Sequence, residues 1–166
     1  YCGAVAVSWY RNEYTLNAIQ TLLSAGVKTN IHYVLGKNSI DEAIDRLKRN
    51  AFPDGINAVI FLLHKPAGQG SKNNVLAFED PRVAEFFAQV DMPHPFKVGM
   101  DSCNVPGAIH FCKRVRPESL DTCEGGRFSC YIGADMVMVP CSFDQDKRYA
   151  VSLCEMTITE AWNSGP

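Results

Sequence analysis

Three cysteines surround a short stretch of the chain that has the pattern of a β-hairpin. Two runs of mostly aromatic and β-branched residues, 128–132 and 136–140, flank a Gly-Ala-Asp sequence with the composition of a tight turn. Because a hairpin brings its two ends together, we expect Cys123 and Cys141 to lie near each other at its open end, where a metal centre could bridge them. Cys130 falls inside the first predicted strand, and the alternation of that strand decides which face its side chain joins.

The cysteine content favours metal binding over disulfides. The chain has seven cysteines among 166 residues, and 46% of its residues are hydrophobic, so it needs no disulfide framework. Thiolates are the usual ligands of iron–sulfur clusters. Structural zinc sites usually use Cys-x₂₋₄-Cys spacings, and no pair of cysteines here is that close. Cys112 and Cys154 are expected to fill core positions instead.

The first hundred residues alternate between strand and helix patterns. Helix starts are indicated by Ser39 with Glu42, which has the spacing of a capping box, and by Asp80 followed by Pro81. Strands are expected at 4–8, 29–35, 56–63 and 96–100, and helices at 13–25, after Ser39 and after Asp80.

Strands separated by helices predict parallel pairing with right-handed crossovers. The expected fold class is therefore α/β: a partial, half β/α barrel with parallel strands or a small open sheet, followed by a small β-hairpin and a helix. We expect two domains, 1–102 for the half barrel and 103–166 for the extension. Both ends of the sequence have the character of cut ends, so we interpret the chain as the C-terminal part of a larger protein.

The second half resembles a known family. Cys123, Arg127, the Pro140-Cys141 step and the run 157–163, Thr-Ile-Thr-Glu-Ala-Trp-Asn, are similar to the SPASM or twitch extensions of radical S-adenosylmethionine (radical SAM) enzymes. Those extensions follow the catalytic barrel and hold auxiliary iron–sulfur clusters. They usually carry a glycine five residues before the Pro-Cys cysteine, where this chain has Met136.

The resemblance implies a set of site residues. Cys103, Cys123 and Cys141 would supply three thiolates to an auxiliary 4Fe-4S cluster, with Cys130 or a cysteine beyond Pro166 as the fourth ligand. Ser8, at the end of the first predicted strand, would contact S-adenosylmethionine, and His32 on the next strand would face the same cavity. Their alternative roles are a strand-end cap for Ser8 and a buried, hydrogen-bonded side chain for His32.

The resemblance also implies an oxidoreductase-type enzyme that cleaves S-adenosylmethionine to begin radical chemistry on a small-molecule or peptide substrate. The catalytic Cys-x₃-Cys-x₂-Cys motif is absent from these residues, so we expect the fragment alone to be inactive. A net charge of −2 without a long basic run speaks against nucleic-acid binding, and no apolar run is long enough for a membrane span. A cytoplasmic protein is the default expectation.

Two other functions remain open. The chain could be a non-catalytic module that binds zinc or a partner protein, with the α/β part as its scaffold. It could also be an ordinary β/α-barrel enzyme whose base is His32 or Lys65. Because half a barrel leaves two sheet edges unpaired, we further expect the fragment to form a homodimer or to cover an edge with residues 103–166.

Overall fold

The computed structural model describes residues 2–144 and 146–164. Its chain divides into two compact units, each with its own sheet. The sheet unit comprises the residues up to Lys65 and Gly70–Thr122. The cysteine unit comprises Pro66–Gln69 and the residues from Cys123 onward. Each unit is described by itself below.

The sheet unit is built on four parallel strands in the order β1-β2-β3-β4, the order in which they occur along the chain. The strands are β1 (Ala4–Ser8), β2 (Lys28–Leu35), β3 (Ala58–Leu63) and β4 (Lys97–Met100). The helices are α1 (Glu13–Ser24), α2 (Ile40–Arg49), α3 (Pro81–Val90) and α4 (Val105–Phe111), with short 3₁₀ turns at Lys72–Asn74 and Pro117–Ser119. The predicted parallel α/β arrangement is confirmed.

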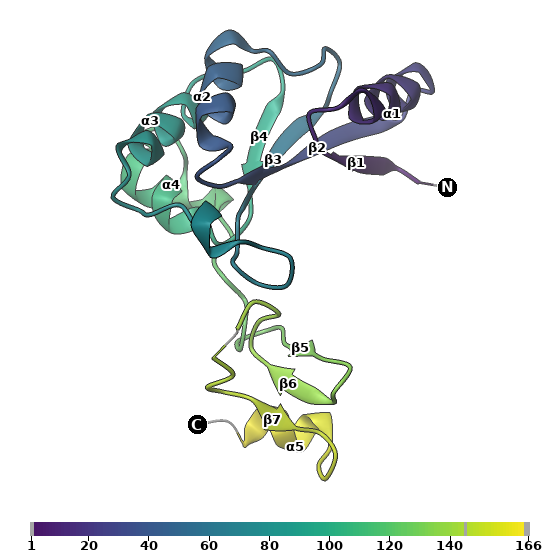
Figure 1. The fold of residues 1–166 in the computed structure, drawn as a ribbon, viewed down its shortest axis with the longest axis vertical. Helices are drawn as coiled ribbons and strands as arrows, with labels where there is room; N and C mark the ends of the chain where they lie inside the picture. Colours follow the sequence, from purple (N-terminus) through teal and green to yellow (C-terminus); the bar gives the residue numbers. More distant parts are fainter. Residues whose placement is uncertain (1, 145, 165–166) are drawn as a thin grey trace. The chain divides into compact units, whose positions relative to one another are not determined.

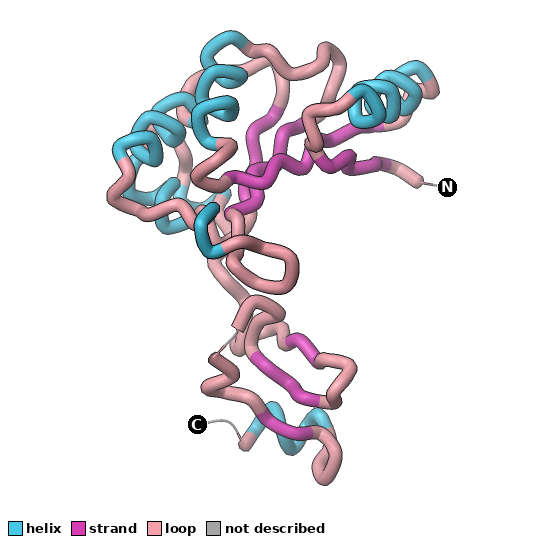
Figure 2. The backbone as a smooth tube through the Cα atoms, in the orientation of Figure 1, coloured by secondary structure: helices cyan, strands magenta, loops and turns pink. Residues whose placement is uncertain are grey.

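One face of this sheet carries the core. Helices α1 and α2 lie on the same side of the strands (Figure 1), and Figure 2 shows the strands as one magenta layer beside them. Along β2 the residues Ile31, Tyr33 and Leu35 are buried and pack with residues of α1, α2, α3 and α4 in one cluster. The alternate residues of β2 belong to the other face, where Val34 is 51% exposed. We call this second face the open face.

The start of α2 differs from its prediction. Ser39 does not cap the helix with its side chain. Its hydroxyl donates to the Val34 carbonyl at 2.8 Å and accepts the Gly36 N–H at 2.9 Å, which closes the preceding turn. The Glu42 carboxylate therefore has no role at the helix start and instead accepts hydrogen bonds from Arg46 Nε at 2.7 Å and from other partners in the core. The capping-box prediction was wrong because Ser39 bonds the preceding turn, and Glu42 bonds the side chains of Arg46, Trp9 and Tyr33.

The cysteine unit holds an antiparallel sheet of three short strands, β5 (Tyr131–Ile132), β6 (Val137–Val139) and β7 (Val151–Ser152), and the helix α5 (Ile158–Asn163). The predicted hairpin followed by a helix is confirmed. Thr157 and Glu160 form a capping box at the start of α5. The described core of this unit is small, because only Met138, Leu153 and Ala161 are buried together.

The hairpin turn is one residue longer than predicted. Met136 has a φ of +58°, the left-handed conformation, and its N–H donates to the Gly133 carbonyl at 3.0 Å. The Gly133 N–H donates to the Val137 carbonyl at 3.0 Å and closes the loop. Cys130 consequently precedes β5 rather than lying inside it. The hairpin therefore forms with Met136, rather than a glycine, in the left-handed position of the turn.

No helix within 2–144 and 146–164 has the length and apolar character needed to cross a membrane.

Candidate metal centre

A tight loop precedes the hairpin and connects two of the predicted ligands, Cys123 and Cys130. The carbonyl of Glu124 accepts the N–H groups of Arg127 and Phe128, both at 2.9 Å, so the chain turns back immediately after Cys123. A further bond from the Gly126 N–H to the Ser129 carbonyl, 2.9 Å long, closes the loop. The two cysteines are therefore the first and last residues of one closed loop.

The Cys123 thiol lies against the second end of the hairpin. A Cβ atom built on Gly125 would be 3.5 Å from the Cys123 Sγ and 2.9 Å from the Pro140 carbonyl oxygen. The thiol and the peptide bond that leads into Cys141 thus lie beside the same point of the loop. A side chain at Gly125 would collide with the Pro140 backbone, which explains why glycine suits this position. The geometry brings the regions of Cys123 and Cys141 together at the open end of the hairpin.

The Cys141 sulfur accepts a backbone hydrogen bond. The Phe143 N–H donates to the Cys141 Sγ at 3.5 Å. Hydrogen bonds to sulfur stabilise the thiolate, the form in which cysteine ligates a metal, and they tune a bound metal. Cys141 is half-buried and Cys123 is exposed.

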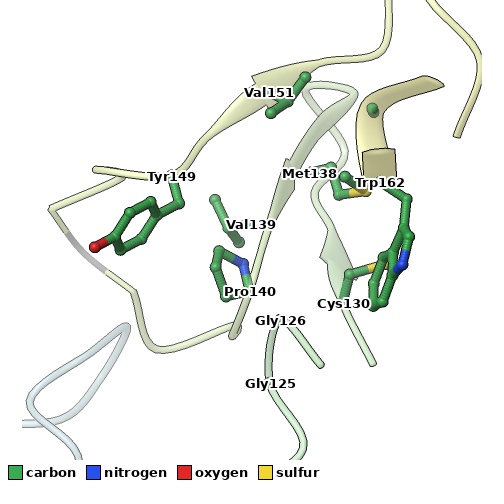
Figure 3. A pocket seen from close by; sticks show the side chains of 10 residues that line it. Gly125, Gly126, Cys130, Met138, Val139, Pro140, Tyr149, Val151 and Trp162 are labelled. Carbon is green, nitrogen blue, oxygen red and sulfur yellow. The ribbon is translucent and has the colours of Figure 1, made fainter. Parts of the chain in front are cut away.

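Cys130 lines a pocket beside this corner. The pocket has a volume of about 330 Å³ and shares Gly125, Gly126 and Pro140 with the surroundings of Cys123 and Cys141. Figure 3 shows the Cys130 side chain directed toward Trp162 of α5, with Met138 nearby. None of the described residues that line the pocket carries a charged side chain. Cys130 itself is exposed, so its thiol lies at the surface beside this pocket.

Two of the other cysteines belong to the sheet unit. Cys103 is exposed there and lines a cavity of about 140 Å³ together with Leu63 and Asn104. Cys112 donates to the Phe87 carbonyl at 3.6 Å, and burial, reinforced by the negative charge of Asp91, raises the pKa of its thiol to about 11. This agrees with the packing role expected of Cys112.

Cys154 was expected in the core, but it is exposed, and its neighbour Leu153 is the buried residue. All seven cysteines are thiols rather than disulfides. Within the described ranges, no three His, Cys, Asp or Glu side chains are grouped so that they could hold a single metal ion. Sites of that kind need their donors around one point. In an iron–sulfur cluster each thiolate binds a different iron, so the donors stand further apart.

Ser8 and His32 lie side by side on the sheet. They are register partners of β1 and β2, and the register continues to Ile60 on β3 and Gly99 on β4. His32 alternates with the buried residues of β2, so both residues belong to the open face. Ser8 is exposed and His32 is half-buried. The two predicted cofactor-binding residues therefore share one face near the carboxyl ends of their strands.

The sequence places Lys65 and Asp101 at the carboxyl ends of predicted strands and suggests Lys65 as a possible base, but it does not predict a contact between them. The structure pairs their side chains at the carboxyl ends of β3 and β4. Both residues follow strands of a predicted parallel sheet, and ligands bind at that end of such strands. That two residues far apart in sequence would meet there depended on a register that the sequence does not reveal.

A scan against protein-family models, a search of curated proteins and a search of solved structures each find no match to this chain. The family resemblance therefore depends on the motif residues alone.

Proposed function

We propose that this chain is the C-terminal part of a radical SAM enzyme whose cysteine unit holds an auxiliary 4Fe-4S cluster. The observation that carries the proposal is the mismatch between the cysteine unit's small core and its four thiols, Cys123, Cys130, Cys141 and Cys154. Units of this size rarely bury enough apolar surface to be stable without disulfides, a metal or a partner. The described thiols form no disulfides, which leaves a metal or a partner as the stabiliser, and thiolates are metal ligands.

The arrangement of the thiols favours a cluster over zinc. Cys123 and the step into Cys141 flank Gly125, and Cys130 lines the adjoining uncharged pocket. The cysteine spacings are all longer than the Cys-x₂₋₄-Cys spacing usual in structural zinc sites, which favours a cluster over a single zinc ion. When bound, such a cluster supplies an electron acceptor or a site that anchors substrate.

The winding of the sheet unit supports the barrel part of the proposal. In doubly wound sheets the strand order reverses and helices cover both faces, whereas in a β/α barrel the strands follow in order and the helices lie outside. Here the order is sequential and the buried cluster lies on one face. The open face would then line the barrel interior, where Ser8 and His32 would contact S-adenosylmethionine and the substrate.

The remaining parts of the proposal follow from the resemblance. The substrate is a small molecule or a peptide, and the reaction is of the oxidoreductase type. Because the catalytic cysteine motif lies outside these residues, the chain by itself is expected not to cleave S-adenosylmethionine. Reduced thiols agree with a cytoplasmic location.

Anaerobic reconstitution with iron and sulfide tests the proposal. We expect the reconstituted chain to show broad absorbance at about 400 nm and to bind iron and sulfide in equal amounts. Cys123→Ser and Cys141→Ser should each remove most of this absorbance, while the matched control Cys2→Ser, an exposed thiol of the sheet unit, should leave it unchanged. Cys130→Ser and Cys103→Ser then decide the remaining ligands.

Two results would contradict the cluster. One is tight binding of a single zinc per chain with no iron retained, which would support the non-catalytic zinc module. The other is equal loss of iron in the Cys2→Ser control, which would indicate non-specific binding by exposed thiols.

A further inference from the structure

A lysine and an aspartate form an ion pair where β3 and β4 end. Asp101 directly follows β4, and Lys65 lies two residues after β3. Their side chains are only 17% and 18% exposed, for Lys65 and Asp101 respectively. Ligands of parallel α/β sheets bind outside the carboxyl ends of the strands, so the pair occupies a position typical of binding residues.

The carboxylate of Asp101 is fixed from several sides. Its Oδ1 accepts the Asn104 backbone N–H at 3.2 Å and the Asn104 Nδ2 at 2.9 Å, and its Oδ2 accepts the Leu63 N–H at 3.2 Å and the Lys65 ammonium. Asn104 is itself 5% exposed, and its Nδ2 also contacts the Phe61 carbonyl oxygen at 3.2 Å. These hydrogen bonds fix the orientation of the Asp101 carboxylate, which in turn positions the Lys65 ammonium.

Stability alone is a weak reason for this arrangement. Removing a lysine and a carboxylate from water costs about as much as their attraction returns, so such a pair contributes little net stability. The Asp101 carboxylate holds the Lys65 ammonium in one position at the strand ends. A preorganised positive charge at a binding edge is suited to an anion.

The neighbouring side chains have compatible chemistry. Asp101 lies two residues after Gly99, which is in register with Ile60, His32 and Ser8. Asp101 lies beyond the end of β4, where its carboxylate accepts the backbone N–H groups of Leu63 and Asn104. A hydroxyl and an imidazole, each able to donate a hydrogen bond, therefore belong to the open face near the strand ends at which the ion pair lies.

We propose that Lys65, positioned by Asp101, is the binding site for an anionic group of a ligand at the carboxyl ends of β3 and β4, either a carboxylate or a phosphate. The proposal concerns the sheet unit and is independent of the metal centre.

Titration of the full, ¹⁵N-labelled chain without iron tests it. Inorganic phosphate and succinate are added separately at constant ionic strength, and the amide signals of Leu63 and Asn104 are followed. We expect saturable shifts with at least one anion. Lys65→Met should weaken binding about tenfold or more, the loss of one charge-assisted hydrogen bond. Lys65→Arg should retain binding because it keeps the charge.

The control variant is Lys97→Met, which removes an equal charge at the opposite end of β4 and should bind like the wild type. Saturation by phosphate alone or by succinate alone supports the proposal and identifies the anion class. Absence of saturation with both anions, or equal weakening in Lys65→Met and Lys97→Met, would overturn it. If Lys65→Met fails to fold, the wild type and Lys65→Arg still decide. Because no iron is present, a failure here is distinct from a failure of the cluster proposal.

Discussion

Replacing Met136 by glycine should stabilise the cysteine unit. Met136 has a φ of +58° in the hairpin turn, and its carbonyl oxygen accepts the Leu153 N–H at 2.8 Å, so the sheet holds the residue in this conformation. A left-handed backbone costs a residue with a side chain roughly 1–2 kcal/mol, and glycine does not incur this cost. The methionine side chain is 49% exposed and loses little burial when removed.

The expected gain is smaller than the relieved strain. Glycine loses more backbone entropy on folding, about 0.5–1 kcal/mol relative to alanine. The difference leaves a net increase of about 0–1.5 kcal/mol in the free energy of unfolding for Met136→Gly. Met136→Ala is the matched control, because it removes the same side chain and keeps the strained backbone. It should leave the stability of the unit unchanged or slightly lower.

The chain provides a specific probe for this measurement. It has two tryptophans, Trp9 in the sheet unit and Trp162 in the cysteine unit. In a Trp9→Phe background, urea unfolding followed by tryptophan emission therefore reports the cysteine unit. The reasoning is refuted if Met136→Gly lowers the urea midpoint, or if Met136→Ala raises it by the same amount as glycine.

Two further predictions concern the sheet unit. A Cβ atom on Gly107 of α4 would overlap the Phe87 ring of α3, so Gly107→Ala should lower the free energy of unfolding by about 1–3 kcal/mol in urea titrations. Gly3→Ala, which has open space around it, should have no such effect. Burial would raise the pKa of Glu42, but hydrogen bonds from Arg46 and other donors outweigh it and hold the pKa below its usual value. The resulting stabilisation is present above the pKa of unfolded glutamate, about 4.3, and is lost as pH falls through the lower folded value, so Glu42→Gln should flatten the acid side of the stability profile. If the free energy of unfolding of Glu42→Gln fell with decreasing pH as steeply as that of the wild type, the role given to the Glu42 carboxylate would be contradicted.

The sequence predicted the regular elements well where local signals were strong. Asp80 before Pro81 marks the start of α3, and the Asp80 carboxylate caps it by accepting the Arg82 N–H at 3.0 Å. Ser39 and Glu42 have the same kind of local signal, yet both side chains have other partners. The Ser39 hydroxyl donates to the carbonyl of Val34 near the end of β2. This contact forms only when β2 is in place.

The candidate sites also include contacts that local sequence patterns predict and contacts that they do not. The approach of Cys123 to the Pro140–Cys141 step follows from hairpin geometry, which a local pattern encodes. The shared face of Ser8 and His32 follows from alternation once the strands pair in register. The Lys65–Asp101 pair could not be predicted in this way, because it depends on which strands are neighbours and how their ends align. Long-range register, rather than local propensity, decides such contacts.

The sequential strand order also has a consequence for how the sheet is assembled. Each strand pairs with the one that precedes it in the chain, from Ala4 with Lys28 to Ala58 with Lys97. During synthesis, every new strand would emerge from the ribosome beside a template that already exists, so the sheet can grow vectorially from β1 to β4. Such nearest-neighbour growth avoids waiting for a distant partner, and it shortens the time for which an unpaired apolar strand such as β3 is available for aggregation.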